Sequence, residues 1–157
     1  MVDPSDPNNT KLVKKKNSFT VAANSRETVF YDTGEDGWVT EIVVDGNSPN
    51  LILEIAFGTD VDSMKIQDAQ NLMLNAPNTS FWVPNFGGSG KYVIAYQPIN
   101  NPTPYKGSIT VNLKNETASD ISITLVTMKK IVAVAPLPVI PPIIPGQEFP
   151  SYGIIEY

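Results

Sequence analysis

The chain has 157 residues, of which 41% are hydrophobic and 17% charged, so it can fold as one domain but carries fewer charges than the roughly 25% of an average soluble domain. Its net charge of −5 argues against nucleic acid as a partner, because phosphate binding needs an excess of Lys and Arg. The absence of Cys and His excludes disulfides, thiolate chemistry and imidazole bases.

No apolar run reaches the length of about 18 residues that a membrane span requires, so we expect no membrane partner. The first 17 residues lack the apolar stretch of a secretory signal, and we therefore expect the chain to be released in the cytoplasm or exported by a route that the sequence does not show.

Residues 1–16 predict a flexible N-terminal arm. Pro4 and Pro7 oppose regular structure, and Lys14, Lys15 and Lys16 form a small positive cluster. Two interpretations remain open: the arm is a solvated terminus, or it lies on an acidic neighbour.

From residue 18 onward, apolar and polar residues alternate with the period of two that is typical of half-buried strands. The predicted strands are residues 18–23, 27–31, 38–45, 51–57, 81–84, 91–96, 107–113 and 121–128. Residues 32–37 form a turn cluster, and Pro84 marks residues 81–84 as an edge strand. Residues 58–80 predict irregular structure with a short strand near 71–74, and residues 97–105 predict a long loop.

Eight or nine short strands with turns every eight to twelve residues, and no convincing helix, predict an all-β fold over residues 17–130. We expect a jelly-roll-like antiparallel β-sandwich. An immunoglobulin-like sandwich is disfavoured because the strand count is high and the Cys–Trp–Cys signature is absent.

Residues 131–157 form a distinct C-terminal tail in which six prolines alternate with large apolar residues. Such a segment favours an extended polyproline II conformation, yet it is too hydrophobic for an ordinary solvated tail. We expect it to dock either on its own domain or, preferably, on a neighbouring subunit or host surface. The expected contact residues are Ile131, Val134, Leu137, Ile140, Ile143, Ile144, Phe149, Tyr152 and Ile155.

Few patterns suggest chemistry. A Ser–His–Asp triad is impossible without His, and we expect neither an enzyme nor a cofactor. Calcium is the best metal candidate, since it needs only oxygen ligands. Asp60 and Asp62 resemble the start of an EF-hand loop, but Lys65 occupies the glycine position. Asp32, Glu35 and Asp36 could also converge.

Adjacent aromatic residues Phe81 and Trp82 point to opposite faces of a strand, so one of them is expected to face outward or into a subunit contact. An exposed aromatic would suit carbohydrate binding or an oligomer interface.

The overall plan resembles the auxiliary capsid proteins of tailed bacteriophages, the decoration or head-fibre class. The features that carry the resemblance are the basic arm over residues 3–16, the strand-rich body over 19–128, the segment 104–111, the tail over 131–157, and the lack of Cys and His. The resemblance covers the whole chain without a diagnostic motif. It implies a homotrimer on the virion surface that binds a major capsid protein lattice through its arms.

We therefore expect a non-enzymatic virion protein that decorates or cements a capsid. Three alternatives remain. The first is a carbohydrate-binding or adhesin-type module, which would show a planar strip of exposed aromatics or a calcium site. The others are another virion component such as a tail subunit, and a hydrolase on a β-sandwich, which would need a cleft of acids.

Overall fold

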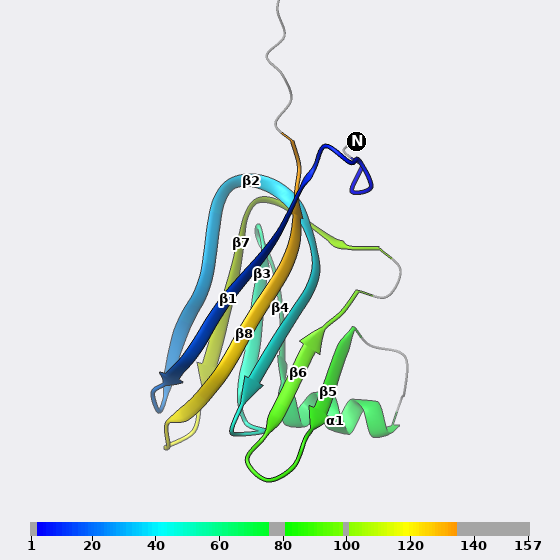
Figure 1. Cartoon of the computed structure of the whole chain (residues 1–157). Helices are drawn as coiled ribbons and strands as arrows, with labels where there is room; N and C mark the ends of the chain where they lie inside the picture. Colours follow the sequence, from blue (N-terminus) through cyan, green and yellow to red (C-terminus); the bar gives the residue numbers. More distant parts are fainter. Residues whose placement is uncertain (1–2, 76–80, 99–100, 135–157) are drawn as a thin grey trace, which may run out of the picture.

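The computed structural model describes residues 3–75, 81–98 and 101–134. Within these ranges the chain forms eight strands and one helix (Figure 1). In chain order they are β1 (Thr10–Val21), β2 (Ser25–Gly46), β3 (Ile52–Phe57), β4 (Asp60–Lys65), α1 (Ile66–Asn75), β5 (Trp82–Phe86), β6 (Tyr92–Tyr96), β7 (Thr103–Asn115) and β8 (Ile121–Val132).

The strands pair in a nested, antiparallel order: β1 with β8, β2 with β7 and β6, and β3 with β4. This nesting is the pairing of a jelly roll. One sheet contains β1, β8, the second half of β2, β6 and β5, and the other contains the first half of β2, β7, β3 and β4. The predicted all-β, jelly-roll-like sandwich is confirmed.

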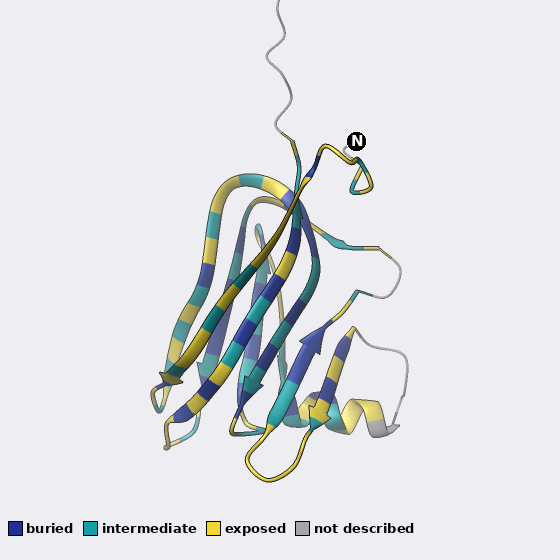
Figure 2. Ribbon diagram, viewed as in Figure 1, coloured by how far each residue is buried: buried dark blue, intermediate teal, exposed yellow. Residues whose placement is uncertain are grey.

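Alternation along the strands places apolar side chains between the two sheets. In β2, Ile42 and Val44 are fully buried while Val43 between them is only half-buried, and β7 buries Ile109 and Val111 in the same way. Figure 2 shows this alternation as bands of buried and exposed residues along each strand. Each such side chain stabilises the fold by about 1.5–3 kcal/mol relative to an exposed position.

The long strand β2 belongs to both sheets because it arches over one end of the molecule, here called the corner end (Figure 1). Its register shifts at Thr33/Glu35 and at Val39/Glu41, and Gly34 has a positive φ of 73°. Bulges and glycines of this kind bend a strand while its pairing continues. Residues 32–37, predicted as a turn, are therefore part of one continuous strand.

At the arch, β2 is paired on both sides. Gly37 lies opposite Tyr105 of β7 and Val132 of β8, and Trp38 lies opposite Pro104 and Ile131. The hydrogen-bonded ladder therefore runs from one sheet into the other through residues 37–39, which fixes the two sheets to each other at this end.

The predicted flexible arm over residues 1–16 is wrong for its last seven residues. β1 begins at Thr10, and residues 10–17 pair with residues 125–132 of β8. The run Lys14, Lys15 and Lys16 hides a period of two, because lysines whose side chains point to the two faces look alike in sequence. Among the described residues, the strands of the sandwich therefore begin at Thr10 and extend to Val132, which places Ile131 in the body.

The prediction for residues 58–80 is also wrong in part, since the structure forms strand β4 and helix α1 there. Ile66 and Ala69, spaced three residues apart, are buried, whereas Leu72 and Met73 are partly exposed. The amides of Ile66 and Gln67 at the helix start donate to the carbonyl oxygens of Leu51 and Pro49. The helix covers the end of the sandwich opposite the corner end (Figure 1).

The remaining strands follow the sequence prediction, with two changes of length. β5 and β6 confirm the strands at 81–84 and 91–96, and β5 lies at a sheet edge, as Pro84 indicated. β7 begins at Thr103, inside the loop predicted for 97–105, and β8 extends four residues beyond 128.

Replacing Gly37 with Ala should destabilise the corner end. An added Cβ would lie 2.4 Å from the Ile131 carbonyl oxygen and 2.7 Å from the Tyr105 hydroxyl oxygen. Because the closer atom belongs to the backbone, we expect the free energy of unfolding in urea to fall by about 1–3 kcal/mol. Gly87→Ala, which would meet only the flexible Lys91 side chain, is the control. Equal effects of the two substitutions would contradict the close packing at Gly37.

Candidate functional site

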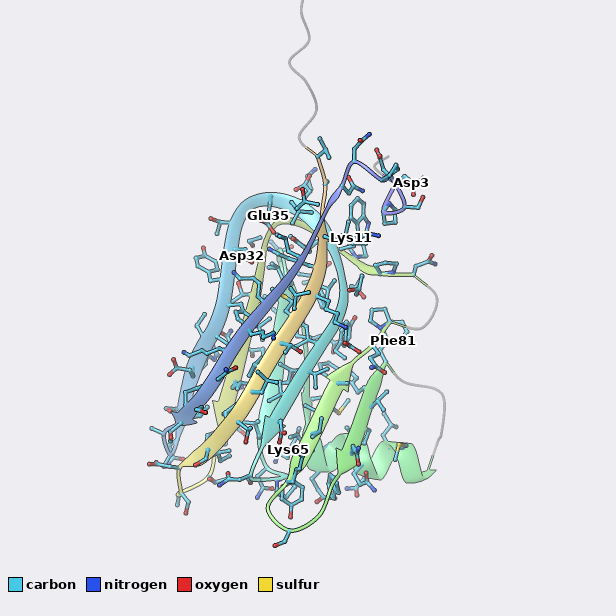
Figure 3. All side chains as sticks on the ribbon, in the orientation of Figure 1. Asp3, Lys11, Asp32, Glu35, Lys65 and Phe81 are labelled. Carbon is cyan, nitrogen blue, oxygen red and sulfur yellow. The ribbon has the colours of Figure 1, made fainter. Side chains whose placement is uncertain are left out.

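A cluster of charged side chains lies inside the corner end, centred on Lys130. This lysine points between the sheets from β8 and is 3% exposed. Its Nζ lies 2.5 Å from Asp32 Oδ2 and 2.5 Å from Glu35 Oε2, both on the arch of β2. Asp32 Oδ1 also accepts a hydrogen bond from Lys14 of β1 at 2.5 Å, and the Tyr105 hydroxyl of β7 donates to Glu35. Figure 3 places Asp32 and Glu35 at the same end of the molecule as Lys11 and Asp3.

Asp32 is ionised in this cluster. Burial is the largest single influence and opposes ionisation, but the hydrogen bonds from Lys130 and Lys14 together outweigh it and hold the pKa of Asp32 below its ordinary value of 3.8. The Asp32 carboxylate therefore remains charged near neutral pH.

Tyr105 contributes as a neutral donor. Burial, followed by its hydrogen bond to Glu35, raises the pKa of the Tyr105 phenol far above its ordinary value of 10.0. The hydroxyl lies over Gly37, where no side chain interferes. Gly37 is thus the residue that lets the phenol reach Glu35.

The cluster is electrostatically complete, with two ammonium groups facing two carboxylates and one phenol. Asp32 and Glu35 do converge, as the sequence suggested, but on an ammonium group, while Asp36 accepts a hydrogen bond from the Gly107 amide. Buried charges persist only when paired in this way. The arrangement holds four strands together, and its carboxylates are occupied by cations rather than poised as bases.

Next to this cluster the surface of the corner end is hollowed. A depression with a volume of about 500 Å³ is lined mainly by apolar groups, including Trp38, Pro104, Tyr105 and Ala133, together with Lys106. A second depression of about 410 Å³ shares Pro104, Tyr105 and Lys106 and continues to the β3–β4 turn at residues 57–60. We call the first of these the corner groove.

Both ends of the described chain meet beside the corner groove. The Ala133 amide donates to the Asp36 carbonyl oxygen at 2.9 Å, and the Val134 amide donates to Asn9 Oδ1 at 3.2 Å. Asn9, which is buried, donates in turn to the Asp3 carbonyl oxygen. Asn9 was not singled out from the sequence, because an Asn in a terminus rich in Pro and Asn is typical of a turn residue.

Only two of the predicted tail contacts lie in the described residues. Ile131 is half-buried in β8, opposite Trp38 and Lys11. Val134 follows the strand and is 49% exposed. The others, namely Leu137, Ile140, Ile143, Ile144, Phe149, Tyr152 and Ile155, lie outside the described residues.

The lysines predicted to form a mobile basic cluster are strand residues. Besides the pairing of Lys14 with Asp32, Lys16 Nζ lies 3.4 Å from Glu27 Oε2 and 4.5 Å from the centre of the Phe19 ring. Lys14 and Lys16 therefore interact with acidic and aromatic side chains of their own chain. Of the three lysines, Lys15 is the one that is exposed to solvent.

Of the neighbouring residues Phe81 and Trp82, one is exposed and the other is buried, as their adjacent positions predicted. Phe81 is 41% exposed, whereas Trp82 is buried and both rings pack against Tyr96 at centroid distances of 5.9 and 5.0 Å. Among the described residues, the other strongly exposed aromatic is Tyr31, on the half of β2 that belongs to the opposite sheet. Phe81 and Tyr31 thus do not make one planar strip.

Asp60 and Asp62, the candidate calcium ligands, lie on edge strand β4 and are exposed. In the part of the chain that the structure describes, no group of three or more acidic side chains is arranged to hold a metal. Nor does any helix there combine the length and apolar character needed to cross a membrane.

Neither the family models nor the curated proteins include a match to this chain.

Replacing Lys130 with Met should strongly destabilise the fold, because Asp32 and Glu35 would then share a partly buried space without the ammonium between them. We expect a loss of about 3 kcal/mol in the free energy of unfolding. Lys129→Met removes only a surface pair with Glu41 and should cost less than about 1 kcal/mol. Comparable losses for neighbouring Lys129 and Lys130 would contradict the central position of Lys130.

Asp32→Asn should show the pH dependence of the cluster. The pKa of Asp32 is lowered in the folded state, so its ionisation stabilises the fold fully above 3.8, and this contribution is lost as the pH falls below that value. We expect the variant to be less stable than the wild type by about 2 kcal/mol near neutral pH. The difference should shrink at about pH 2.5, and thermal unfolding at both pH values measures it. A constant difference would argue against an ionised Asp32.

Proposed function

We propose that this protein is a non-enzymatic structural component of a virion that decorates or cements a capsid. The observation that carries the proposal is the position of the chain ends. The apolar, Pro-rich segment continues directly from β8 at the corner end of a stiff jelly roll, beside an apolar groove.

The charged cluster supports a structural role. Among the described residues, Lys130 is the one charged residue that is buried, and it holds strands together while its carboxylate partners are neutralised within the chain. A catalytic carboxylate must instead be free to exchange a proton with a substrate. In the described residues, the charged groups of the corner end thus connect the two sheets.

An extended arm suits a protein that must join larger objects. A small sandwich offers little area in any single contact, whereas an arm adds contact area and links copies through multivalency. In a closed ring, each arm would dock on the next subunit. We therefore propose a homo-oligomer, with a trimer favoured, on the virion surface and a major capsid protein lattice as its partner. A tail or baseplate subunit could be linked to its neighbours by an arm in the same way.

A carbohydrate-binding role has less support, since Phe81 and Tyr31 lie on different sheets and cannot stack on one sugar chain together.

Removing residues 135–157 should leave the fold intact and abolish assembly. The strands of the described residues all lie before residue 133, so the thermal unfolding midpoint should change little. Light scattering after size exclusion should give the full chain a mass of several copies, three being favoured, and the truncated chain the mass of one. The full chain should also co-sediment with shells of the major capsid protein from the same genome. Lack of binding to such shells, or a genome without a capsid protein, would refute the proposal.

A further inference from the structure

The corner groove is built as a fixed receptor surface. Trp38 and Pro104 lie opposite each other on β2 and β7, where β2 is paired on both sides. Tyr105, which lines the same groove, is 4% exposed and is held by its hydrogen bond to Glu35. Since its walls are anchored before any ligand arrives, the groove would lose little conformational entropy on binding.

The chemistry of the groove fits a proline-rich apolar segment. Grooves lined by aromatic and proline side chains bind polyproline II segments, whose conformation is largely formed in advance. The lining of the groove is mainly apolar, with Asp36 and Lys106 as its two charged residues, so a strongly polar peptide would be a poor occupant. This chain contains a segment of the required kind at residues 135–146, APLPVIPPIIPG.

The position at which the segment begins indicates whether it binds the groove of its own chain or that of another copy. Ala133 itself lines the groove, and the segment starts two residues later. Ala135, Leu137 and Ile140 each precede a proline, which disfavours the helical region and keeps a chain extended. An extended segment that starts at the rim would have to reverse direction at once to enter its own groove, whereas residues 135–142 in a polyproline II conformation would span about 25 Å at about 3.1 Å per residue.

We propose that the corner groove of one copy binds the Pro-rich segment 135–146 of a second copy. The inference rests on the proposed function, because it names the contact through which the protein would assemble. Each copy then offers one donor segment and one acceptor groove. Such a heterologous contact closes into a ring when the rotation between copies allows it.

Two full-length variants separate donor from acceptor. The acceptor variant, Pro104→Glu, places a carboxylate at an exposed position of the groove wall. The donor variant replaces Pro136, Pro138, Pro141 and Pro142 with Gly, which removes the stiffness of the segment. Ser89→Glu, an exposed substitution with the same charge change in the β5–β6 loop, is the control.

Light scattering across a concentration series should show that each variant needs a concentration about tenfold or more higher than the wild type for half-association. The Ser89→Glu protein should behave as the wild type. Mixing the two variants should restore one contact, between an intact segment and an intact groove, and give a mass of two chains. Circular dichroism verifies that every variant is folded.

The results distinguish the possible failures. An assembling wild type with an unaffected Pro104→Glu variant would overturn the groove assignment alone. Two monomeric variants that fail to associate when mixed would mean that the segment docks on its own chain, which also overturns the inference. A wild type that is monomeric at every concentration would overturn the inference, whereas the proposed function would still be decided by binding to shells of the major capsid protein.

Discussion

The buried ammonium group of Lys130 is the constraint on which the corner end depends. Removing such a charge from water costs several kcal/mol unless opposite charges replace the lost solvent. Asp32 and Glu35 supply them only because β2 arches from one sheet to the other and brings positions 32 and 35 over β8. A slip of β8 by one residue would turn Lys130 to solvent, so the ion cluster also specifies the strand register.

The same cluster shapes the surface above it. Glu35 is held by Lys130 and in turn holds the Tyr105 hydroxyl, and Gly37 leaves room for that contact. Tyr105 and Trp38 then form part of the groove wall. The buried ion pairs therefore fix the positions of the aromatic residues that line the corner groove.

The sequence predicted the fold where local pattern and tertiary structure agree. Residues 38–45 and 107–113 alternate cleanly because one face is buried, and both became strands. The arch was missed because residues 32–37 have the composition of a turn, and only pairing with β7 and β8 keeps them in a strand. The first half of β1 was missed since lysines occupy both of its faces.

The candidate site was less predictable than the fold. Lys130 was treated as the end of the domain, because nothing in the neighbouring residues indicates a partner 98 positions earlier in the chain. The acids at 32 and 35 were noted, but their counter-ion depends on the fold. Helix α1 is short and only partly covered, so its pattern of apolar residues was ambiguous.

The place of β8 between two neighbours has a mechanical consequence. β8 is flanked by β1 along its whole length and by the second half of β2, and it leads directly into residues 135–157. A pull applied at Val134 in the direction of β8 would be resisted in shear by the ladders on both sides together. The load passes through β2 into the second sheet, and the sandwich carries tension as one body rather than unravelling from its last strand.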